Sequence, residues 1–502
     1  MNSKKLIFLL FLLVPIYFYG IHYLPFRGEE PNRILTAYEM VYFHDFFNLT
    51  HLGEPYYNKP PLFMWLVALW SSIFGWSQEV ARTISVISSF LTALLVFFFS
   101  KELLFRDDNK NALLAVLIFL TLGDLLFFYG FLAEIDAFLM FLNTLGIFVL
   151  YKLLKKGKDF WAFTFAGIFT ALSFLTKGLP AFYHIPISFL ILLFYFGRFK
   201  RIFSTNLLGG LFGLFAPLTV WYINLKHPLP YLQTLWHESF NRTPIAEKGG
   251  FFKHLLLYPL LNLKQTLPYS IIAPFALFKN KIPASREILL LLALIGFNYL
   301  PYWISPGARG RYIMLIFPFL AIVFALLLSK LNSLFNRNLI TYTILGTSLI
   351  SFLLSAFLFF DHFEFFNFYG IYPFLGISLI LLLFSVFYWK RFNNLGALIL
   401  LLAILKVGYI NYIAPLKDKN HPERQVVLEF SKFINRSPQK EPIITYLPKH
   451  IDMELCAYLD IYSKGIVLRK EGTFFITRKG KMPKRPYKIL DTSHGWVLGT
   501  FK

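Results

Sequence analysis

Long apolar runs, separated by short polar stretches, recur along the chain from residue 6 to about residue 413. Most are roughly 15–22 residues long, which is close to the length that an α-helix needs to cross the hydrocarbon core of a bilayer. Beyond residue 413 the sequence becomes mixed and polar. The pattern therefore predicts an all-α polytopic membrane domain at 1–413, followed by a soluble domain at 414–502.

Basic residues decide the orientation of these runs, because cytoplasmic loops are enriched in lysine and arginine. Basic clusters recur along the chain, and two apolar runs lie between most successive clusters. The interval 6–100 holds three runs, and an odd number of crossings would place Lys101 and every later cluster outside. We therefore expect run 61–75 to lie in the outer interface, since it is short and begins at Pro60 and Pro61.

With that choice the sequence predicts thirteen spans, a cytoplasmic amino terminus and an extracytoplasmic carboxy-terminal domain. The spans are approximately 6–24, 80–100, 112–130, 137–154, 161–176, 180–196, 205–223, 259–278, 288–303, 311–329, 339–359, 370–389 and 395–413. Two long outer loops remain, at about 25–79 and 224–258, and loops of that length are usually functional. We therefore expect a multi-pass membrane protein whose active surface faces the periplasm or the cell exterior.

The carboxy-terminal region predicts a small α/β domain. Helical patterns occupy 422–434 and 451–460, and strand-like runs occupy 442–447, 464–469, 473–478 and 487–490. From Lys417 onward there are seventeen lysine and arginine residues against nine acidic ones. A basic face above the membrane favours phosphorylated or acidic lipid headgroups. A solvated basic surface is the alternative.

Composition supports the membrane assignment. The chain is 57% apolar and 15% charged, whereas soluble domains carry about 25% charged residues, so a water-soluble enzyme is excluded. The net charge of +22 indicates cytoplasmic loops and anionic lipids, and no nucleic-acid motif is present. The single cysteine, Cys456, excludes an intramolecular disulfide and a cysteine-based metal site.

The first outer loop opens with an acidic pair, Glu29 and Glu30, closely followed by Arg33. Carboxylates just outside a membrane helix lie in a region of intermediate dielectric, where their pKa can rise enough for general-base catalysis. The alternative is that the pair is simply solvated.

The same loop contains Tyr57, Asn58 and Lys59 immediately before two prolines. The prolines hold the lysine at the start of the interface helix, at the depth of a lipid phosphate. The alternative is a lysine that snorkels at a helix end.

The second outer loop carries His237, Glu238 and Arg242. The histidine and glutamate suit a metal ion or a proton relay, and the arginine suits a phosphate. A single His-Glu pair is a weak metal motif.

Further polar residues stand at the outer ends of apolar spans: Asp136, Lys177, Arg309, Arg311 and Tyr312. Each has capping or snorkelling as its alternative, but the topology brings all of them to one face of the membrane. Asp124, His184 and Lys406 also interrupt spans. Ionisable residues at such depth are often functional, yet the sequence assigns these three no role.

These motifs occur in a characteristic order: an acidic pair after the first span, a KPPL segment, an acidic residue after the third span, a TKG turn, a His-Glu-x-x-x-Arg segment and a late Arg-Tyr pair. In order and sidedness, over about residues 1–330, the chain resembles the GT-C glycosyltransferases of the protein mannosyltransferase and lipid A aminoarabinose transferase superfamily. The resemblance implies transfer of a sugar from a polyprenyl-phosphate carrier to an acceptor at the outer face.

The resemblance also implies roles for individual residues. Glu29 matches the family's first-loop aspartate, the base that activates the acceptor, and Glu30 and Asp136 are the other acidic candidates. The carrier phosphate and substrate would be bound by Lys59, Arg33, Tyr57, Lys177, His237, Arg242, Arg311 and Tyr312. Cations near the phosphate would stabilise the leaving group, and attack from the opposite face would invert the anomeric carbon.

Two departures from the family pattern bear on cofactors. Some relatives have a glutamate before the KPPL lysine that shares a metal with the second-loop histidine, whereas this chain has Asn58. We therefore predict no obligatory metal, with His237 at most a ligand of a non-essential divalent ion. The arginine after the acidic pair is also displaced, because Asn32 precedes Arg33.

Three functions remain open at this point. The first is modification of lipid A or another envelope glycolipid, which the thirteen spans and the basic domain favour. The second is protein O-glycosylation by the same chemistry. The third is a lipid or sugar transporter or flippase, although such proteins concentrate polar groups near the bilayer midplane.

Overall fold

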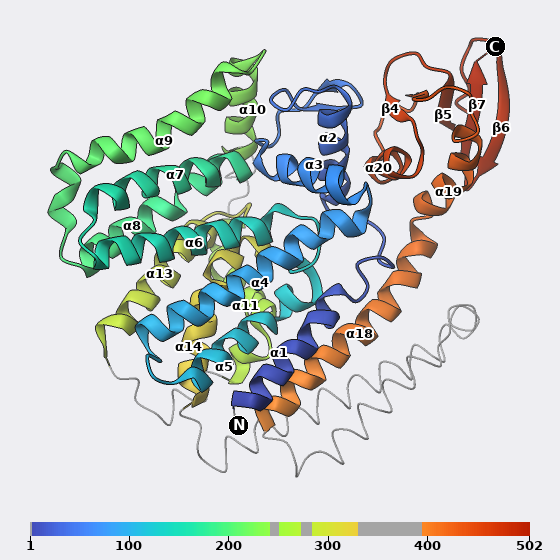
Figure 1. Ribbon diagram of the computed structural model, residues 1–502. Helices are drawn as coiled ribbons and strands as arrows, with labels where there is room; N and C mark the ends of the chain where they lie inside the picture. The colour runs from blue at the N-terminus through green and yellow to red at the C-terminus, as the bar shows by residue number, and fades with distance from the viewer. Residues whose placement is uncertain (1–2, 241–249, 273–283, 330–393, 502) are drawn as a thin grey trace.

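The computed structural model describes residues 3–240, 250–272, 284–329 and 394–501. The predicted spans at 339–359 and 370–389, part of the predicted span 259–278, and Arg242 lie outside the described residues. A large helical bundle carries a smaller sheet-containing unit beyond its last described helix (Figure 1).

The bundle is built from α1 (Ser3–Phe18), α4 (Gln78–Leu103), α5 (Asn109–Leu120), α6 (Ile135–Lys155), α7 (Asp159–Lys177), α8 (His184–Tyr195), α9 (Asn206–Ile223), α13 (Arg286–Trp303), α14 (Phe317–Ser329) and α18 (Asn394–Asn420). In the part of the chain that the structure describes, five helical stretches are long and apolar enough to cross a membrane. They are 78–103, 135–155, 159–177, 206–223 and 310–329. The predicted total of thirteen spans is not confirmed.

Small residues allow close backbone contact between α7 and α9. A Cβ atom added to Gly167 of α7 would lie 2.1 Å from the carbonyl oxygen of Gly210, and one added to Gly213 would lie 2.2 Å from that of Thr164. Backbones that approach this closely gain van der Waals contact, which is the main attraction between helices in lipid. Elsewhere α18 packs beside α1, where Tyr19 donates a hydrogen bond to Asn411 at 2.6 Å.

The predicted span 112–130 is not one continuous helix. It breaks after α5, and a short π-helix, η1 (Leu125–Tyr129), follows. After the break the backbone N–H of Gly123 donates to the Leu267 carbonyl at 3.1 Å, and a Cβ atom at Gly123 would lie 3.0 Å from the Lys264 carbonyl oxygen, so glycine permits this close approach. The exit also turns buried Asp124 toward Lys264 and Gln265.

The two predicted outer loops are largely folded. The first contains α2 (Glu30–Tyr42), a hairpin of β1 (Thr50–His51) with β2 (Glu54–Pro55), and α3 (Leu62–Phe74), which matches the predicted helix at 61–75. The second contains α10 (Pro228–Phe240) and α11 (Gly250–Leu263). Short helical turns complete the connections: η2 (Leu179–Phe182), η3 (Phe199–Phe203), η4 (Lys264–Thr266) and η5 (Gly310–Ile316).

The carboxy-terminal unit matches the predicted α/β pattern with one addition. It contains α19 (Glu423–Ile434), β3 (Ile443–Tyr446), α20 (Met453–Tyr462), β4 (Ile466–Leu468), β5 (Phe474–Arg478), β6 (Tyr487–Ser493) and β7 (Trp496–Phe501). The sheet order is β4-β3-β5-β7-β6; β3 pairs in parallel with β4 and β5, and β7 pairs antiparallel with β5 and β6. Strand β7 is absent from the sequence prediction.

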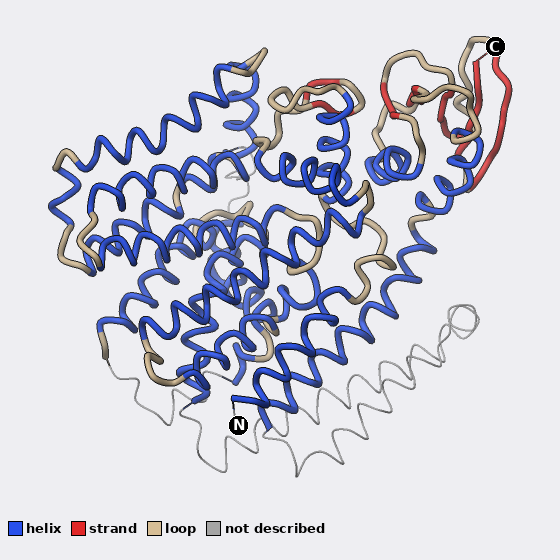
Figure 2. Tube along the Cα trace, in the orientation of Figure 1, coloured by secondary structure: helices blue, strands red, loops and turns tan. Residues whose placement is uncertain are grey.

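The sheet unit packs against the first outer segment, so the two share one apolar core. The ring of Tyr458 on α20 stacks on Phe26 at 4.3 Å, and its hydroxyl accepts a hydrogen bond from the Phe26 backbone at 3.0 Å. Figure 2 shows that the described strands lie in the hairpin after α2 and in this unit. The predicted domain boundary at 413 stays a prediction, and α18 continues past it to Asn420.

Candidate functional site

A cavity of about 450 Å³ opens where the first outer segment meets the amino end of α6, the carboxyl end of α7, α10, and the chain from α13 to η5. Its charged lining includes Glu29, Arg33, Lys59, Asp136, Lys177 and Arg311. All six are sequence-predicted site residues, and they come from distant parts of the chain. The fold therefore brings together most of the predicted site.

Asp136 is the centre of a buried ionic network in this cavity. It lies in the first turn of α6 and accepts from Lys177, the last residue of α7, at 2.5 Å. Its other carboxylate oxygen lies 3.3 Å from Nε of Arg311. Because two cations from different elements converge on one carboxylate, Asp136 fixes the position of both.

Arg311 is shared with a second carboxylate that the sequence analysis did not single out. Its Nη1 lies 2.7 Å from Oε1 of Glu134, which is buried just before α6. Burial raises the pKa of Glu134, and the nearby charge of Asp136 acts in the same direction, whereas Arg311 opposes them. The Glu-Ile-Asp sequence at the start of α6 was the available signal, because two carboxylates two residues apart rarely enter an apolar helix without partners.

Glu29 lies at the edge of this network, with its side chain partly exposed. Its backbone N–H donates to Oε1 of Glu134 at 3.1 Å. The preceding Gly28 has φ +60°, and a Cβ atom there would lie 2.6 Å from the same oxygen. A glycine is therefore required for the first outer segment to approach the network this closely.

The surroundings of Glu29 keep its carboxylate ionised. Burial pushes its pKa upward, but Arg33, a hydrogen bond from Asn32 at 2.7 Å, Arg311 and Arg309 together bring that pKa below its usual value. The expectation that an acidic residue here has a raised pKa is wrong for Glu29. The reason is that the cations expected to serve the phosphate also face this carboxylate.

Glu30 has a different environment from its neighbour. Both of its oxygens accept hydrogen bonds from Arg82 of α4, at 2.8 and 2.7 Å. They also accept backbone N–H groups from Arg27 and Ala133, at 2.9 and 2.7 Å. Glu30 and Arg82 are fully buried, so this pair joins the first outer segment to α4 and does not line the cavity. A charge inside the run 80–100 was the signal for Arg82.

The tyrosine and lysine of the KPPL segment take separate positions. Lys59 lines the cavity and donates to the Asn58 carbonyl at 3.0 Å. Tyr57 instead packs its ring against Tyr231 of α10 at 4.9 Å. Its neighbour Tyr56 lines the cavity and accepts a hydrogen bond from Arg33 at 3.2 Å. Because adjacent residues in an extended segment face opposite sides, a shift of one position changes which ring reaches the cavity.

The second predicted loop contributes through α10. Glu238 and Ser239 line the cavity, whereas His237 is exposed and is not part of the lining. Tyr312 lines the cavity, and the ammonium of Lys177 lies 4.0 Å from the centre of its ring. Buried His184 lies behind the cavity, with its ring nitrogens 3.0 Å from Asn298 and 2.6 Å from Tyr302.

Sequence comparison finds related proteins. Residues 58–223 match the family model described as dolichyl-phosphate-mannose-protein mannosyltransferase. An uncharacterized protein of Aquifex aeolicus is 25% identical over 94% of this chain and 92% of its own length. An undecaprenyl phosphate-alpha-4-amino-4-deoxy-L-arabinose arabinosyl transferase of Aeromonas hydrophila is 27% identical over 64% of this chain. That alignment covers 59% of the Aeromonas protein, so the chain matches less than two thirds of its length.

Structural comparison finds the same fold over nearly the whole chain. The crystal structure of ArnT from Cupriavidus metallidurans bound to undecaprenyl phosphate has a TM-score of 0.75, with 99% of this chain and 98% of that chain covered, at 14% identity. The apo structure of the same protein gives 0.72 at 12% identity. Together, the comparisons show that the chain has the fold of ArnT and is similar in sequence to part of the protein mannosyltransferase family and to the aminoarabinose transferases.

Proposed function

We propose that the protein transfers a sugar from a polyprenyl-phosphate carrier to an envelope glycolipid of the lipid A type, at the periplasmic face of the inner membrane. The observation that carries the proposal is the cavity in which Glu29 faces the cations Lys59, Lys177 and Arg311. The names of the Aeromonas relative and of the undecaprenyl-phosphate-bound ArnT structure support a polyprenyl-phosphate carrier.

The cations serve the leaving group. When the bond between the anomeric carbon and the carrier phosphate breaks, the electron pair stays on the phosphate, which gains negative charge. Lys177 and Arg311 are already fixed by Asp136, so they stabilise that charge without rearranging.

Glu29 serves the acceptor. As the acceptor oxygen bonds to the anomeric carbon, its proton becomes strongly acidic, so a carboxylate of low pKa is a sufficient base. The ionised carboxylate also stabilises positive charge at the anomeric carbon. Attack opposite the departing phosphate gives inversion. The base and the leaving-group cations then need no nucleotide and no metal ion for the transfer itself.

Transfer to protein is the second candidate, and the mannosyltransferase family match at 58–223 favours it. The chemistry at the anomeric carbon would be the same, because only the acceptor differs.

We also propose that the amino terminus is cytoplasmic and the carboxy-terminal domain periplasmic. Reporter fusions at both ends, read in cells, test that orientation.

Mass spectrometry of envelope glycolipids tests the proposed function. Cells that express the wild type should gain a sugar-sized mass on lipid A or its core, and cells that express Glu29→Gln should not. Glu54→Gln is the matched control, because Glu54 is an exposed acidic residue of the same outer segment. The same sugar on a protein fraction instead would favour the second candidate, and an identical glycolipid profile for wild type and Glu29→Gln would contradict the role of Glu29.

A further inference from the structure

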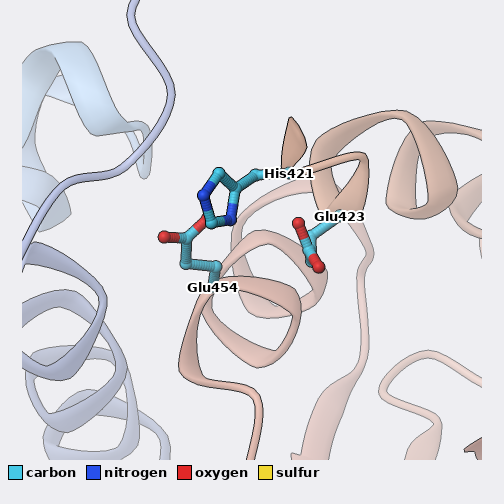
Figure 3. A group of neighbouring side chains, drawn as sticks. All are labelled: His421, Glu423 and Glu454. Atoms are coloured by element: carbon cyan, nitrogen blue, oxygen red, sulfur yellow. The ribbon is translucent and has the colours of Figure 1, made fainter. Parts of the chain in front are cut away.

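A second group of ionisable side chains lies outside the cavity, where α18 gives way to the sheet unit. His421 stands in the short link between α18 and α19, Glu423 is the first residue of α19, and Glu454 lies in the first turn of α20. One ligand atom from each lies within 4.8 Å of the others. Figure 3 shows the imidazole of His421 between the two carboxylates.

From this geometry we propose that His421, Glu423 and Glu454 bind one Zn²⁺ ion. An imidazole nitrogen with two carboxylate oxygens is a donor set that suits zinc better than magnesium or calcium. Three protein ligands leave a fourth position for water. Ligand atoms bound at about 2.1 Å in a tetrahedron lie about 3.4 Å apart, so small side-chain rotations complete the site.

One carboxylate oxygen of the group is available to a cation. Oε2 of Glu423 is shielded from solvent and accepts no hydrogen bond among the described residues. The neighbouring arginines have other partners: Arg424 donates to the carbonyls of His22 and Tyr23 at 3.3 and 3.5 Å. Arg478 lies 3.8 Å from the ring centre of Trp496 and pairs with Asp452.

The position of the site indicates what the ion would do. It would join the end of α18 to the first turns of α19 and α20. Helix α20 carries Tyr458, which packs on Phe26 three residues before Glu29. The ion would therefore fix α20, the helix that contacts the segment leading into the cavity, to the ends of α18 and α19, as a structural ion that takes no part in sugar transfer.

Metal analysis of the full-length, tag-free protein in detergent tests this proposal independently of any enzymatic assay. After removal of metal and titration with Zn²⁺, the wild type should bind one equivalent and its melting temperature should rise. His421→Ala and Glu454→Gln should weaken binding at least tenfold and abolish the rise. His450→Ala, which removes an exposed histidine of the same unit, should bind as the wild type does.

The outcomes separate this site from other sources of zinc binding. If His237→Ala loses the equivalent while His421→Ala keeps it, the ion belongs to α10 and the proposal is overturned. Absence of stoichiometric binding to a folded wild type would overturn it equally. Unchanged binding in Glu454→Gln would remove that ligand, and the three-residue site with it.

Discussion

The ion pairs at the two ends of helix α6 differ in how far their side chains are exposed to solvent. At its start, Asp136 and Glu134 pair with Lys177 and Arg311, whose side chains are 7% and 10% exposed. At its end, about 30 Å away for 21 residues, Glu102 pairs with Lys152 and Lys155, which are 41% and 52% exposed. Charge is thus enclosed at one end and solvated at the other.

The difference shows where chemistry is expected. Buried ion pairs repay their desolvation only with near-complete partnering, and they fix the positions of their members. Exposed pairs contribute little and rearrange freely. The basic end fits the positive charge of cytoplasmic loops, whereas the enclosed end combines fixed cations with an ionised carboxylate around a cavity.

The largest expected effect is on catalysis at the enclosed end. Glu29→Gln should lower kcat about 10²–10⁴-fold, because it removes the general base, with little change in donor KM.

Since the pKa of Glu29 lies below its usual value, wild-type transfer should stay level from about pH 7.5 to about pH 5.5 and fall only in stronger acid, where the carboxylate becomes protonated. A kinetic pKa near neutrality that disappears in Glu29→Gln would contradict this assignment.

The next effect is on stability. Glu30→Gln should destabilise the fold by about 3–5 kcal/mol, because it leaves Arg82 buried with half of its anionic partner replaced by an amide. Thermal unfolding in detergent, followed by tryptophan fluorescence, measures the change. A melting temperature equal to that of the wild type would show that this buried pair does not hold the first outer segment to α4.

A smaller effect is expected on donor binding and turnover. Lys177→Ala should lower kcat/KM about tenfold or more, through both kcat and the donor KM, since a charged hydrogen-bond donor near the proposed phosphate position is worth about 1.5–3 kcal/mol. Lys177→Arg, which keeps the charge, should recover part of the loss. An unchanged kcat/KM, measured with a short-chain polyprenyl-phosphate sugar, would show that Lys177 does not contact the carrier phosphate.

The smallest effect should occur at the exposed end. Glu102→Gln removes the partner of Lys152 and Lys155, yet it should change stability by less than about 1 kcal/mol and leave transfer unchanged. The same unfolding and kinetic assays apply. A loss of stability comparable to that of Glu30→Gln would show that the exposed ion pairs contribute as much as the buried ones.

The sequence predicts the parts of the site that depend on one local signal. Charged residues at the ends of apolar runs, such as Asp136, Lys177 and Arg311, are visible without a structure, and the topology assigns them to one face. Their pairing is not predictable in this way, because it depends on how α6, α7 and η5 pack. Against the effect of burial, the pKa of Glu29 is lowered first by Arg33 and Asn32 of its own segment and then by Arg311 and Arg309, so only the second part of the lowering depends on tertiary packing.

For the fold as well, elements that depend on nearby sequence are predictable, and features that depend on distant contacts are not. Most bundle helices and three of the strands after β3 follow from periodicity, whereas α2 and α10 lie in regions predicted only as loops. The sequence does not predict β7, because Gly499 interrupts a short run. The two-residue turn at His494 and Gly495, between β6 and β7, was the signal that indicates a hairpin. After the break that follows α5, Gly123 bonds to Leu267, more than 140 residues away, and no local pattern predicts that contact.

The central claim is that the enclosed end, and not the basic end, holds the polyprenyl-phosphate donor. A photoreactive polyprenyl-phosphate analogue, cross-linked to the protein in membranes and mapped by peptide mass spectrometry, tests it directly. The account predicts labelling of the segments around residues 29–33, 56–59, 177–183 and 300–312, in competition with unlabelled carrier. Specific labelling around 101–110, 152–159 and 198–204 instead would contradict it.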